Sequence, residues 1–189
     1  MSAMVEREVK LRFGNAEEAR DAVLAIGATP MRERRFQDDA LFDNEREDLR
    51  QRRCALRLRR EGSQSYLTFK GPVQPGPMKL REELETLVAD ASVLQRVLEQ
   101  LDLHVWFRYQ KYREEYALDG VVVAIDETPI GTFVELEGTE AGITAAAAAL
   151  GRTTADYILD SYCGLFMRSR EALGFRGSHM IFDEPDRIT

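Results

Sequence analysis

The residues of this chain whose types and spacing could do chemistry are charged side chains that recur at every second position. The first ten residues contain Glu6, Glu8 and Lys10, which alternate with the apolar residues Val5 and Val9. Successive side chains of a β-strand point to opposite faces, so this pattern predicts a strand with one apolar and one charged face. Carboxylates beside an ammonium group could bind a metal ion and an anion together.

The same alternation recurs in five further segments, at residues 56–59, 68–70, 81–85, 111–113 and 135–137. For any single strand, a solvated outer face would give the same pattern. Taken together, however, the rows hold almost no Ser, Asn, Gln or Thr, which a merely wet face has no reason to exclude. Together with the nearby Asp126, the charged residues of these rows are Lys10, Arg12, Arg57, Arg59, Lys70, Arg81, Lys111, Arg113, Glu6, Glu8, Glu83, Glu85, Glu135 and Glu137.

These charged rows predict a closed sheet. An antiparallel sheet cannot bury so dense a charged face against helices, because an unpaired buried charge is strongly destabilising. A barrel of about eight strands can enclose that face around water, ions and one small ligand. We therefore expect an α+β fold: a closed eight-stranded antiparallel β-barrel with a charged interior and with helices packed against its apolar outer face.

The charges also predict the ligand. The eight basic groups suit a ligand with about four or five negative charges, since arginine and lysine commonly hold phosphate. The neighbouring carboxylates would repel such a ligand unless they hold Mg²⁺ or Mn²⁺, which take oxygen ligands and bridge to phosphate oxygens. The sequence therefore predicts a triphosphate bound together with a divalent cation.

Capping and turn signals locate the elements that must position these rows. Asn15 and Asp90 each precede a helical pattern, and the first helix ends at Gly27. Turns at 61–63 and 119–120 predict hairpins. Strands are expected at about 55–60, 66–70, 79–87, 105–117, 121–126 and 132–138, with an extended segment at 36–42, a turn or short helix at 43–53, a loop at 71–77, a helix through 145–151 and a longer helix from about 154 to 173.

Composition limits the remaining classes of function. The chain has 189 residues and a formal net charge of −7, and it lacks a linker-like segment, so we expect one domain over 1–173 and a loosely ordered tail over 174–189. The acidic excess argues against a nucleic-acid surface. No stretch approaches the roughly 18 apolar residues that cross a bilayer, and the N-terminus lacks a signal-peptide pattern. The expected location is cytoplasmic, without membrane contact, and a homodimer is left open.

Six motifs in order make the assignment more specific. They are Glu6-x-Glu8-x-Lys10, Leu-Arg-Leu-Arg at 56–59, Leu-Thr-Phe-Lys-Gly-Pro at 67–72, Arg81-x-Glu83-x-Glu85, Lys111-x-Arg113 with Asp126, and Gly-Thr-Phe-Val-Glu-Leu-Glu at 131–137. Over about residues 4–168 the chain resembles the CYTH superfamily, the triphosphate tunnel metalloenzymes. That group includes class IV adenylyl cyclases, thiamine triphosphatases and inorganic triphosphatases.

The resemblance implies roles for the charged residues inside an eight-stranded tunnel. It implies a triphosphate grip formed by Lys10, Arg57, Arg59, Lys70, Arg81, Lys111 and Arg113. It implies metal ligands at Glu6, Glu8, Asp126, Glu135 and Glu137, with Glu83 and Glu85 binding metal or supporting the ligands. Among these residues, the predicted catalytic set is Lys10, Lys70, Lys111 and Asp126.

Two reactions share this substrate grip. Hydrolysis of tripolyphosphate or a nucleoside triphosphate needs a water aligned on a terminal phosphorus, whereas cyclisation of ATP needs the ribose 3′-oxygen aligned on the α-phosphorus. Segments such as Gln37-Asp38-Asp39 are closest to bacterial class IV adenylyl cyclases, and no lysine follows Lys111, which disfavours thiamine triphosphatase. We expect hydrolysis first, cyclisation to cyclic AMP and pyrophosphate second, and a non-catalytic polyphosphate- or nucleotide-binding module third.

Overall fold

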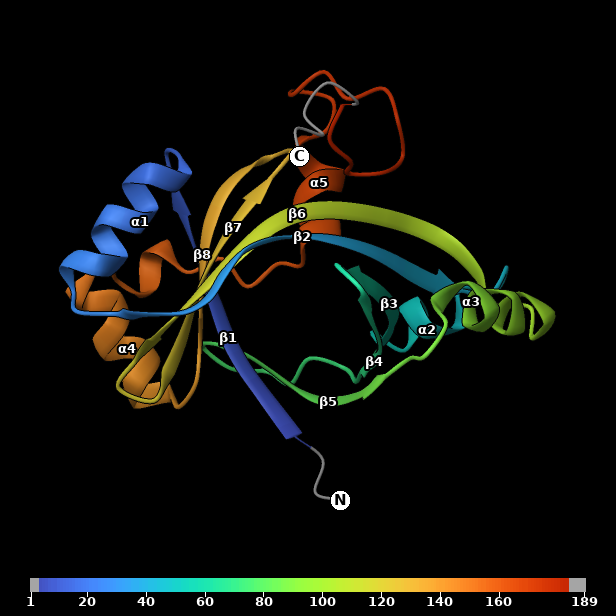
Figure 1. The fold of residues 1–189 in the computed structure, drawn as a ribbon, viewed down its shortest axis with the longest axis horizontal. Coiled ribbons are helices and arrows are strands. Elements are labelled where there is room, and N and C mark those ends of the chain that lie inside the picture. The colour runs from blue at the N-terminus through green and yellow to red at the C-terminus, as the bar shows by residue number, and fades with distance from the viewer. Residues whose placement is uncertain (1–3, 184–189) are drawn as a thin grey trace.

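The computed structural model describes residues 4–183, which form a closed antiparallel barrel (Figure 1). Its strands are β1 (Met4–Phe13), β2 (Thr29–Asp43), β3 (Ala55–Glu61), β4 (Gln64–Lys70), β5 (Lys79–Leu87), β6 (His104–Leu118), β7 (Val121–Thr128) and β8 (Gly131–Glu137). The order around the barrel is β1-β5-β4-β3-β2-β6-β7-β8, and β8 pairs with β1 to close it. The predicted fold class is confirmed.

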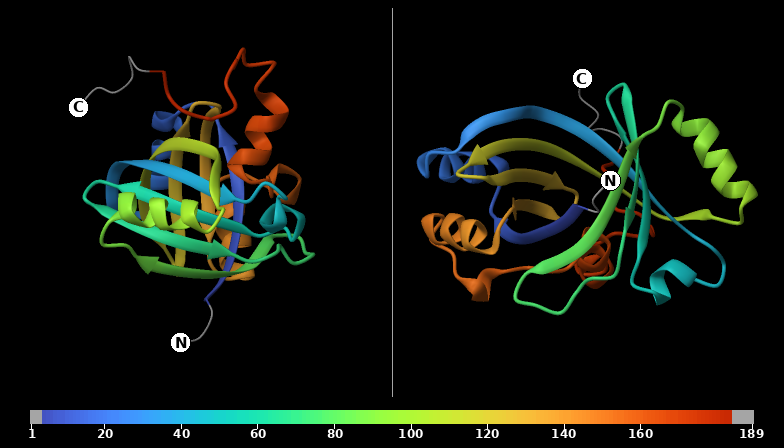
Figure 2. Two further views of the ribbon diagram at one scale, coloured as in Figure 1. Left: turned by 90° about the vertical axis from the view of Figure 1, so that its right-hand side faces the viewer. Right: turned by 90° about the horizontal axis from the view of Figure 1, so that it is seen from below.

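Helices lie around the outside of this barrel. Helices α1 (Ala16–Ala25) and α4 (Glu140–Ala149) lie on one side of the molecule, and the short α2 (Asp48–Gln51) and α3 (Ala91–Gln100) lie on the other (Figures 1 and 2). As predicted, Asn15 accepts a hydrogen bond from the Glu18 N–H, and Asp90 accepts from the N–H groups of Ser92 and Val93. None of the helices among residues 4–183 is long and apolar enough to cross a membrane.

The hydrophobic core lies between the barrel and its helices, not inside the barrel. Val9 and Leu11 of β1 are fully buried in a cluster that includes Val23 of α1 and Ile143 of α4. Lys10, which alternates with them, points to the opposite face of the strand. The outward apolar face and the inward charged face therefore follow from the period-two pattern of the sequence.

Tight turns fix the register of the long hairpin. At the β6–β7 turn, Asp119 and Gly120 have φ values of 44° and 78°, and Leu118 pairs with Val121. Two successive residues with positive φ match the twist of the flanking strands. The turn therefore holds β6 and β7 in a register that places Arg113 opposite Asp126.

The single long helix predicted over about 154–173 is wrong. The structure has a 3₁₀ turn (Thr154–Asp156), an extended segment and then helix α5 (Tyr162–Ser169), which Ser161 caps by accepting from the Gly164 N–H. The β1–β5 pairing ends at Glu8, so the edge of β1 beyond it needs another partner. Ile158 supplies that partner: its N–H donates to the Lys10 carbonyl at 2.9 Å, and its carbonyl accepts from the Lys10 N–H at 3.1 Å.

Residues 174–183, expected to begin a loosely ordered tail, contain no helix or strand but are attached to β6. Met180 is fully buried; its N–H donates to the Arg108 carbonyl, and its own carbonyl accepts from the Gln110 N–H at 2.8 Å. The Phe182 N–H donates to the Gln110 side chain. The rest of the predicted tail, 184–189, lies outside the described residues.

Candidate functional site

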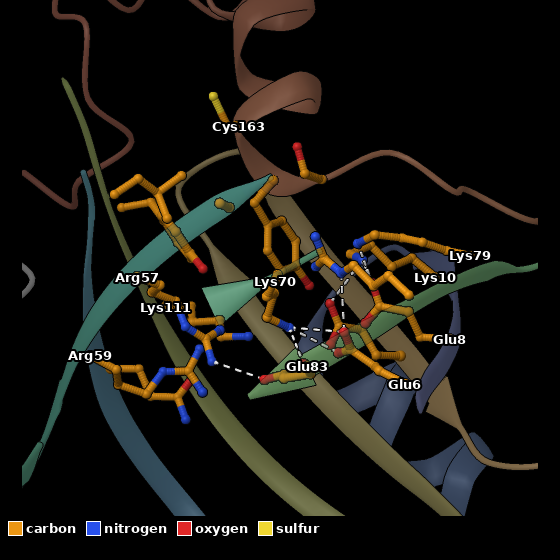
Figure 3. Close-up of a pocket in the computed structure, with 18 of the residues that line it drawn as sticks. Glu6, Glu8, Lys10, Arg57, Arg59, Lys70, Lys79, Glu83, Lys111 and Cys163 are labelled. Carbon is orange, nitrogen blue, oxygen red and sulfur yellow. Dashed lines mark hydrogen bonds and ion pairs between the residues drawn. The ribbon is translucent and has the colours of Figure 1, made fainter. Parts of the chain in front are cut away.

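The barrel interior contains a cavity of about 610 Å³, shown in Figure 3. All seven basic residues of the predicted triphosphate grip line it. The acids that line it include Glu6, Glu8, Glu83, Glu85, Glu135 and Glu137. Residues far apart in the sequence meet here because alternate residues of each strand point inward. Arg12, which continues the first row, does not line the cavity; its guanidinium lies over the Phe133 ring and donates to the Ile130 carbonyl.

Strands β1 and β8 bring four carboxylates together. Their register places Glu8 opposite Glu137 and Lys10 opposite Glu135. Like charges directly opposite one another are destabilising, so cations must lie between them. The Lys10 ammonium lies 2.9 Å from a Glu8 oxygen and 3.2 Å from a Glu135 oxygen, and Lys79 of β5 also forms an ion pair with Glu8.

Glu6 is held between strands β4 and β5. It accepts from the Lys70 ammonium through both oxygens at 3.0 Å and from the Arg81 Nε at 3.2 Å. Lys70 also contacts a Glu83 oxygen at 2.7 Å. Burial alone would raise the pKa of Glu6, but the charge of Lys70 lowers it to about 2. Glu6 therefore stays ionised at neutral pH.

The other side of the cavity is rich in arginine. In Figure 3, Arg57, Arg59 and Lys111 lie across from Glu6 and Glu8. Arg59 makes two hydrogen bonds to the fully buried Asp39, at 2.9 and 3.1 Å, while Arg57 lies 3.6 Å from the same carboxylate. The Arg57 Nε is buried without a hydrogen-bond partner among residues 4–183. This side thus has cationic hydrogen-bonding capacity that its own acids do not satisfy.

Asp126 is the predicted site residue that does not line the cavity. Its carboxylate is fully buried and accepts from the Lys111 Nζ at 2.8 Å, the Arg113 Nε at 2.6 Å and the Tyr162 Oη at 2.6 Å. Three donors therefore occupy a group that the sequence analysis placed among the metal ligands and catalytic residues. In this arrangement Asp126 orients Lys111 and Arg113 from behind the cavity wall.

Lys79 and Tyr162 are among the cavity-lining residues that sequence reasoning missed. Lys79 precedes Arg81 by two positions in the predicted strand, so period two alone could have assigned it to the charged row. Tyr162 was assigned to a packing stripe; it does contact the Phe133 ring, but its hydroxyl also binds Asp126. No local signal reveals that hydroxyl bond, because α5 and β7 are distant in the sequence.

Two lysines of the site have pKa values below that of an ordinary lysine. Burial, together with the positive charge of Arg113, lowers the pKa of Lys111 to about 8. Burial and the charge of Lys10 likewise lower the pKa of Lys79 to about 8. Lys10 behaves differently: although burial would lower its pKa, Glu135 and Glu8 raise it, so this ammonium stays charged.

Glu137 differs from Glu6, Glu8 and Glu135, which are all paired with lysine or arginine. It is exposed, and it makes no hydrogen bond or ion pair within the part of the chain that the structure describes. Although its side chain reaches solvent, desolvation of the carboxyl group and the charges of Glu6, Glu8 and Glu135 raise its pKa to about 7 against the opposing charge of Lys70. A carboxyl that holds its proton because of neighbouring carboxylates marks a place where a bound cation would relieve repulsion.

The donor set at this place fits a hard divalent cation. Glu6, Glu8, Glu135 and Glu137 offer carboxylate oxygens, which Mg²⁺ and Mn²⁺ prefer. Among residues 4–183, no three Asp, Glu, His or Cys side chains form a preassembled metal centre, and three of these four acids are paired with lysine or arginine. The four carboxylates therefore match a divalent cation in ligand type and charge, but they do not form a preassembled metal centre.

Comparison with known proteins identifies the family. The CYTH domain model matches residues 4–162, so the chain belongs to the CYTH domain family. Its members are generally enzymes that depend on a divalent metal. A protein of Methanocaldococcus jannaschii named "Putative adenylate cyclase MJ0240" is 28% identical over 135 residues, which cover 71% of this chain and 77% of that protein.

Solved structures share the fold. The crystal structure of a "putative adenylate cyclase" from Vibrio parahaemolyticus matches with a TM-score of 0.73 and 21% identity, over 85% of this chain and 97% of that one. HpAC1 from Hippeastrum, described as a "putative adenylyl cyclase" that reveals a dominant triphosphatase activity, matches with a TM-score of 0.63 and 18% identity, over 87% and 95% of the two chains. At these identities the likeness concerns the fold.

Proposed function

We propose that this protein hydrolyses a triphosphate, inorganic or carried on a nucleoside, with a divalent metal as cofactor. The observation that carries the proposal is the combination, in one cavity, of arginines with unused donors and of a carboxylate, Glu137, without a counter-charge. A receptor for anions alone would gain nothing from acids beside its ligand. A metal–triphosphate complex supplies both missing partners.

In this proposal the basic residues hold the phosphate oxygens. Without ligand, Lys70 and Arg81 are paired with Glu6, and Arg113 is paired with Asp126 and Glu135. The triphosphate would take over part of this pairing, and the released carboxylates would need another cation. Arginine forks and lysine ammonium groups from different strands would fix the phosphates along the cavity.

The released carboxylates, Glu6, Glu8, Glu135 and Glu137, would hold Mg²⁺ or Mn²⁺. When bound, such an ion neutralises charge on the phosphate oxygens. Glu83 and Glu85 would support this set, since Glu83 contacts Lys70 and Glu85 accepts from Thr68. Asp126 would orient Lys111 and Arg113.

Lys111 is our candidate for accepting a proton from the attacking water. A general base must be unprotonated, and a pKa of about 8 makes that form accessible near neutral pH. Lys10 and Lys70 would act as fixed cations beside the acids, with Lys10 kept charged by Glu8 and Glu135. In this proposal Lys111 would accept the proton, while Lys10 and Lys70 would keep their charge.

Cyclisation of ATP is the second candidate, because the relative from M. jannaschii carries a cyclase name. That name does not decide the reaction, since the Hippeastrum protein combines a cyclase name with dominant triphosphatase activity. A binding module without turnover is the third candidate. Each of the three would use the same phosphate grip.

Product analysis separates these candidates. The purified protein is incubated with ATP or tripolyphosphate in Mg²⁺, in Mn²⁺ or in EDTA, and phosphorus NMR identifies the products. We expect orthophosphate or pyrophosphate from hydrolysis, and only with metal. Cyclic AMP with pyrophosphate would favour the cyclase, and unchanged substrate under all conditions would overturn the enzymatic proposal.

A further inference from the structure

We propose that Gln37 of β2 holds the attacking water: its side-chain oxygen accepts a hydrogen bond from that water, and the other water proton goes to Lys111. This inference rests on the proposed function, because it names the group that would orient water for the hydrolysis. Gln37 is uncharged, so it does not belong to the charged rows of the sequence. Its role is inferred from an unpaired atom inside the barrel.

The Gln37 side chain is buried, and only half of its amide is used. The residue lines the cavity and is 1% exposed. Its Nε2 donates to a Glu61 carboxylate oxygen, and its Oε1 has no hydrogen-bond partner among residues 4–183. A buried acceptor without a partner destabilises a fold, so a donor that binds there gains a hydrogen bond.

The chemistry of Glu61 fixes which half of the amide is unused. Although burial raises the pKa of Glu61, the hydrogen bond from Gln37 and the charge of Arg35 lower it overall. The carboxylate is therefore ionised and can only accept hydrogen bonds. The Gln37 nitrogen must face Glu61, and the oxygen must face away from it.

The strand register places Gln37 beside the proposed base. Gln37 is directly opposite Lys111 on β6 and directly opposite Glu61 on β3. Directly opposite side chains on one face of a sheet have Cβ atoms about 4.5–5.5 Å apart. All three residues line the cavity, so their side chains share its inner face. A water between Gln37 and Lys111 can therefore contact both side chains.

The groups around Gln37 favour water over the other ligands of the site. Phosphate oxygens accept hydrogen bonds, so a triphosphate oxygen would meet a second acceptor at the Gln37 oxygen. Mg²⁺ can bind an amide oxygen, but Lys111 is adjacent to Gln37, and the acids Glu6 and Glu8 lie across the cavity from Lys111 (Figure 3). Water carries no charge and has two hydrogens to donate, so it matches an unpaired acceptor beside a lysine.

In the proposed step, the water oxygen forms a bond to the terminal phosphorus while the bridging P–O bond breaks. The electron pair of the broken bond leaves with the shortened phosphate chain. One water proton goes to the unprotonated Lys111 amine, and the other, held by the Gln37 oxygen, stays with the orthophosphate product. Orientation before attack lowers the barrier, and a displacement of about 1 Å can cost roughly 100-fold in rate.

Gln110 of β6 provides a matched control. It is also buried, at 3% exposed, but it does not line the cavity, and both ends of its amide are used. Its Nε2 donates to Asp38 and its Oε1 accepts from the Phe182 N–H, each at 3.2 Å. A fully paired glutamine stabilises the fold, whereas the unpaired oxygen of Gln37 does not. The two residues therefore separate structural effects from catalytic ones.

Gln37→Met and Gln110→Met are compared with the wild type by steady-state kinetics on tripolyphosphate with Mg²⁺. We expect Gln37→Met to lower kcat about 10- to 100-fold and to keep KM within about twofold, because it loses a contact to the nucleophile and none to the phosphates. The Mg²⁺ concentration that gives half-maximal rate should not change. Gln110→Met should keep the wild-type kcat.

Thermal unfolding of the same variants should give the opposite order. Gln110→Met loses two hydrogen bonds, whereas Gln37→Met loses one, and Glu61 keeps its ion pairs with Arg32 and Arg35. The Tm should therefore fall further in Gln110→Met than in Gln37→Met. A loss of kcat in the more stable of the two variants is the result that a purely structural role of Gln37 does not give.

Gln37→Asn is a second variant that keeps the site polar. It retains the amide but shortens the side chain by one methylene group, so the oxygen no longer reaches the same water. We expect a loss of kcat similar to that of Gln37→Met. Wild-type kcat in both variants would overturn the inference. So would a raised KM with unchanged kcat, which would make Gln37 a phosphate contact, or a raised Mg²⁺ requirement, which would make it a metal ligand.

The two proposals fail in distinguishable ways. If the wild type hydrolyses tripolyphosphate and Gln37→Met does so with the same kcat, the proposed function stands and the role of Gln37 is wrong. If the wild type cleaves no triphosphate with either metal, the proposed function is wrong, and the role of Gln37 is wrong with it.

Discussion

The two sides of the barrel cavity differ in how their charges are paired: lysines lie among Glu6 and Glu8 on one side, and Arg57 and Arg59 lie across from them (Figure 3). On the side formed by β1 and β8, four glutamates gather, and Glu137 has no cationic partner among residues 4–183. On the side formed by β2 and β3, Arg57 and Arg59 share one buried acid, Asp39. Under the proposed function, the first side would hold the cation and the second side the polyanion.

This arrangement of charges destabilises the protein when no ligand is bound. Buried charges that lack a full set of partners are destabilising, and like charges in register add repulsion. Lys10 reduces that repulsion by lying between Glu8 and Glu135, but it cannot also neutralise Glu137. The remaining imbalance is what a metal–triphosphate complex would remove, so each side can be tested separately.

The largest expected effect comes from the acidic side. Glu135→Gln should reduce triphosphate turnover roughly 100-fold, because a displaced metal or a disturbed ligand shell costs activity on that scale. Circular dichroism would verify that the variant stays folded. The matched control is Glu114→Gln on the outer face, where Glu114 pairs with Arg20 and does not line the cavity. Equal turnover in Glu135→Gln and wild type would remove the acidic side from the mechanism.

The arginine side should affect binding. Replacing Arg57 or Arg59 with Ala should weaken tripolyphosphate binding by about 1.5–3 kcal/mol, the usual contribution of a hydrogen bond to a charged group. Calorimetric titration measures this loss. Arg34→Ala is the control, since Arg34 pairs with Glu127 and does not line the cavity. An unchanged heat signature in both cavity variants would place these arginines outside the phosphate site.

A smaller effect concerns pH. Below about pH 8 Lys111 is protonated and cannot accept a proton; above it the free amine is present. With saturating Mg²⁺, kcat/KM should therefore rise about tenfold between pH 7 and pH 9 and then level off, since this ratio reports ionisations of the free enzyme. Lys111→Met should lose this rise along with most of its activity. A maximum near pH 6 would contradict the assignment.

The same comparison explains which parts of the molecule the sequence could predict. Strand periodicity sufficed for the barrel and for the inward direction of the seven basic residues of the predicted grip, because inward or outward direction is a local property of each strand. The helix caps at Asn15 and Asp90 are local signals as well. These features depend on neighbours within a few residues.

The features that could not be predicted depend on contacts across the barrel. Ile158 is extended because the edge of β1 at Lys10 requires a partner, although the flanking sequence has helical periodicity. Asp126 has the charge of a metal ligand, yet Lys111, Arg113 and Tyr162 occupy its oxygens. These hydrogen bonds to Asp126 depend on which strands and helices meet in the fold. They cannot be predicted from the sequence of any single segment.

The most direct test of the opposed charges is the linkage between metal and triphosphate binding. Calorimetry would compare the affinity for tripolyphosphate in Mg²⁺ with that in EDTA, for the wild type and for a Glu6→Gln/Glu137→Gln variant. Since bound ions couple to ligand affinity through free energies of about 1–3 kcal/mol, we predict at least about tenfold tighter binding with Mg²⁺ in the wild type and no such gain in the variant. Equal affinities with and without Mg²⁺ in the wild type would contradict the account.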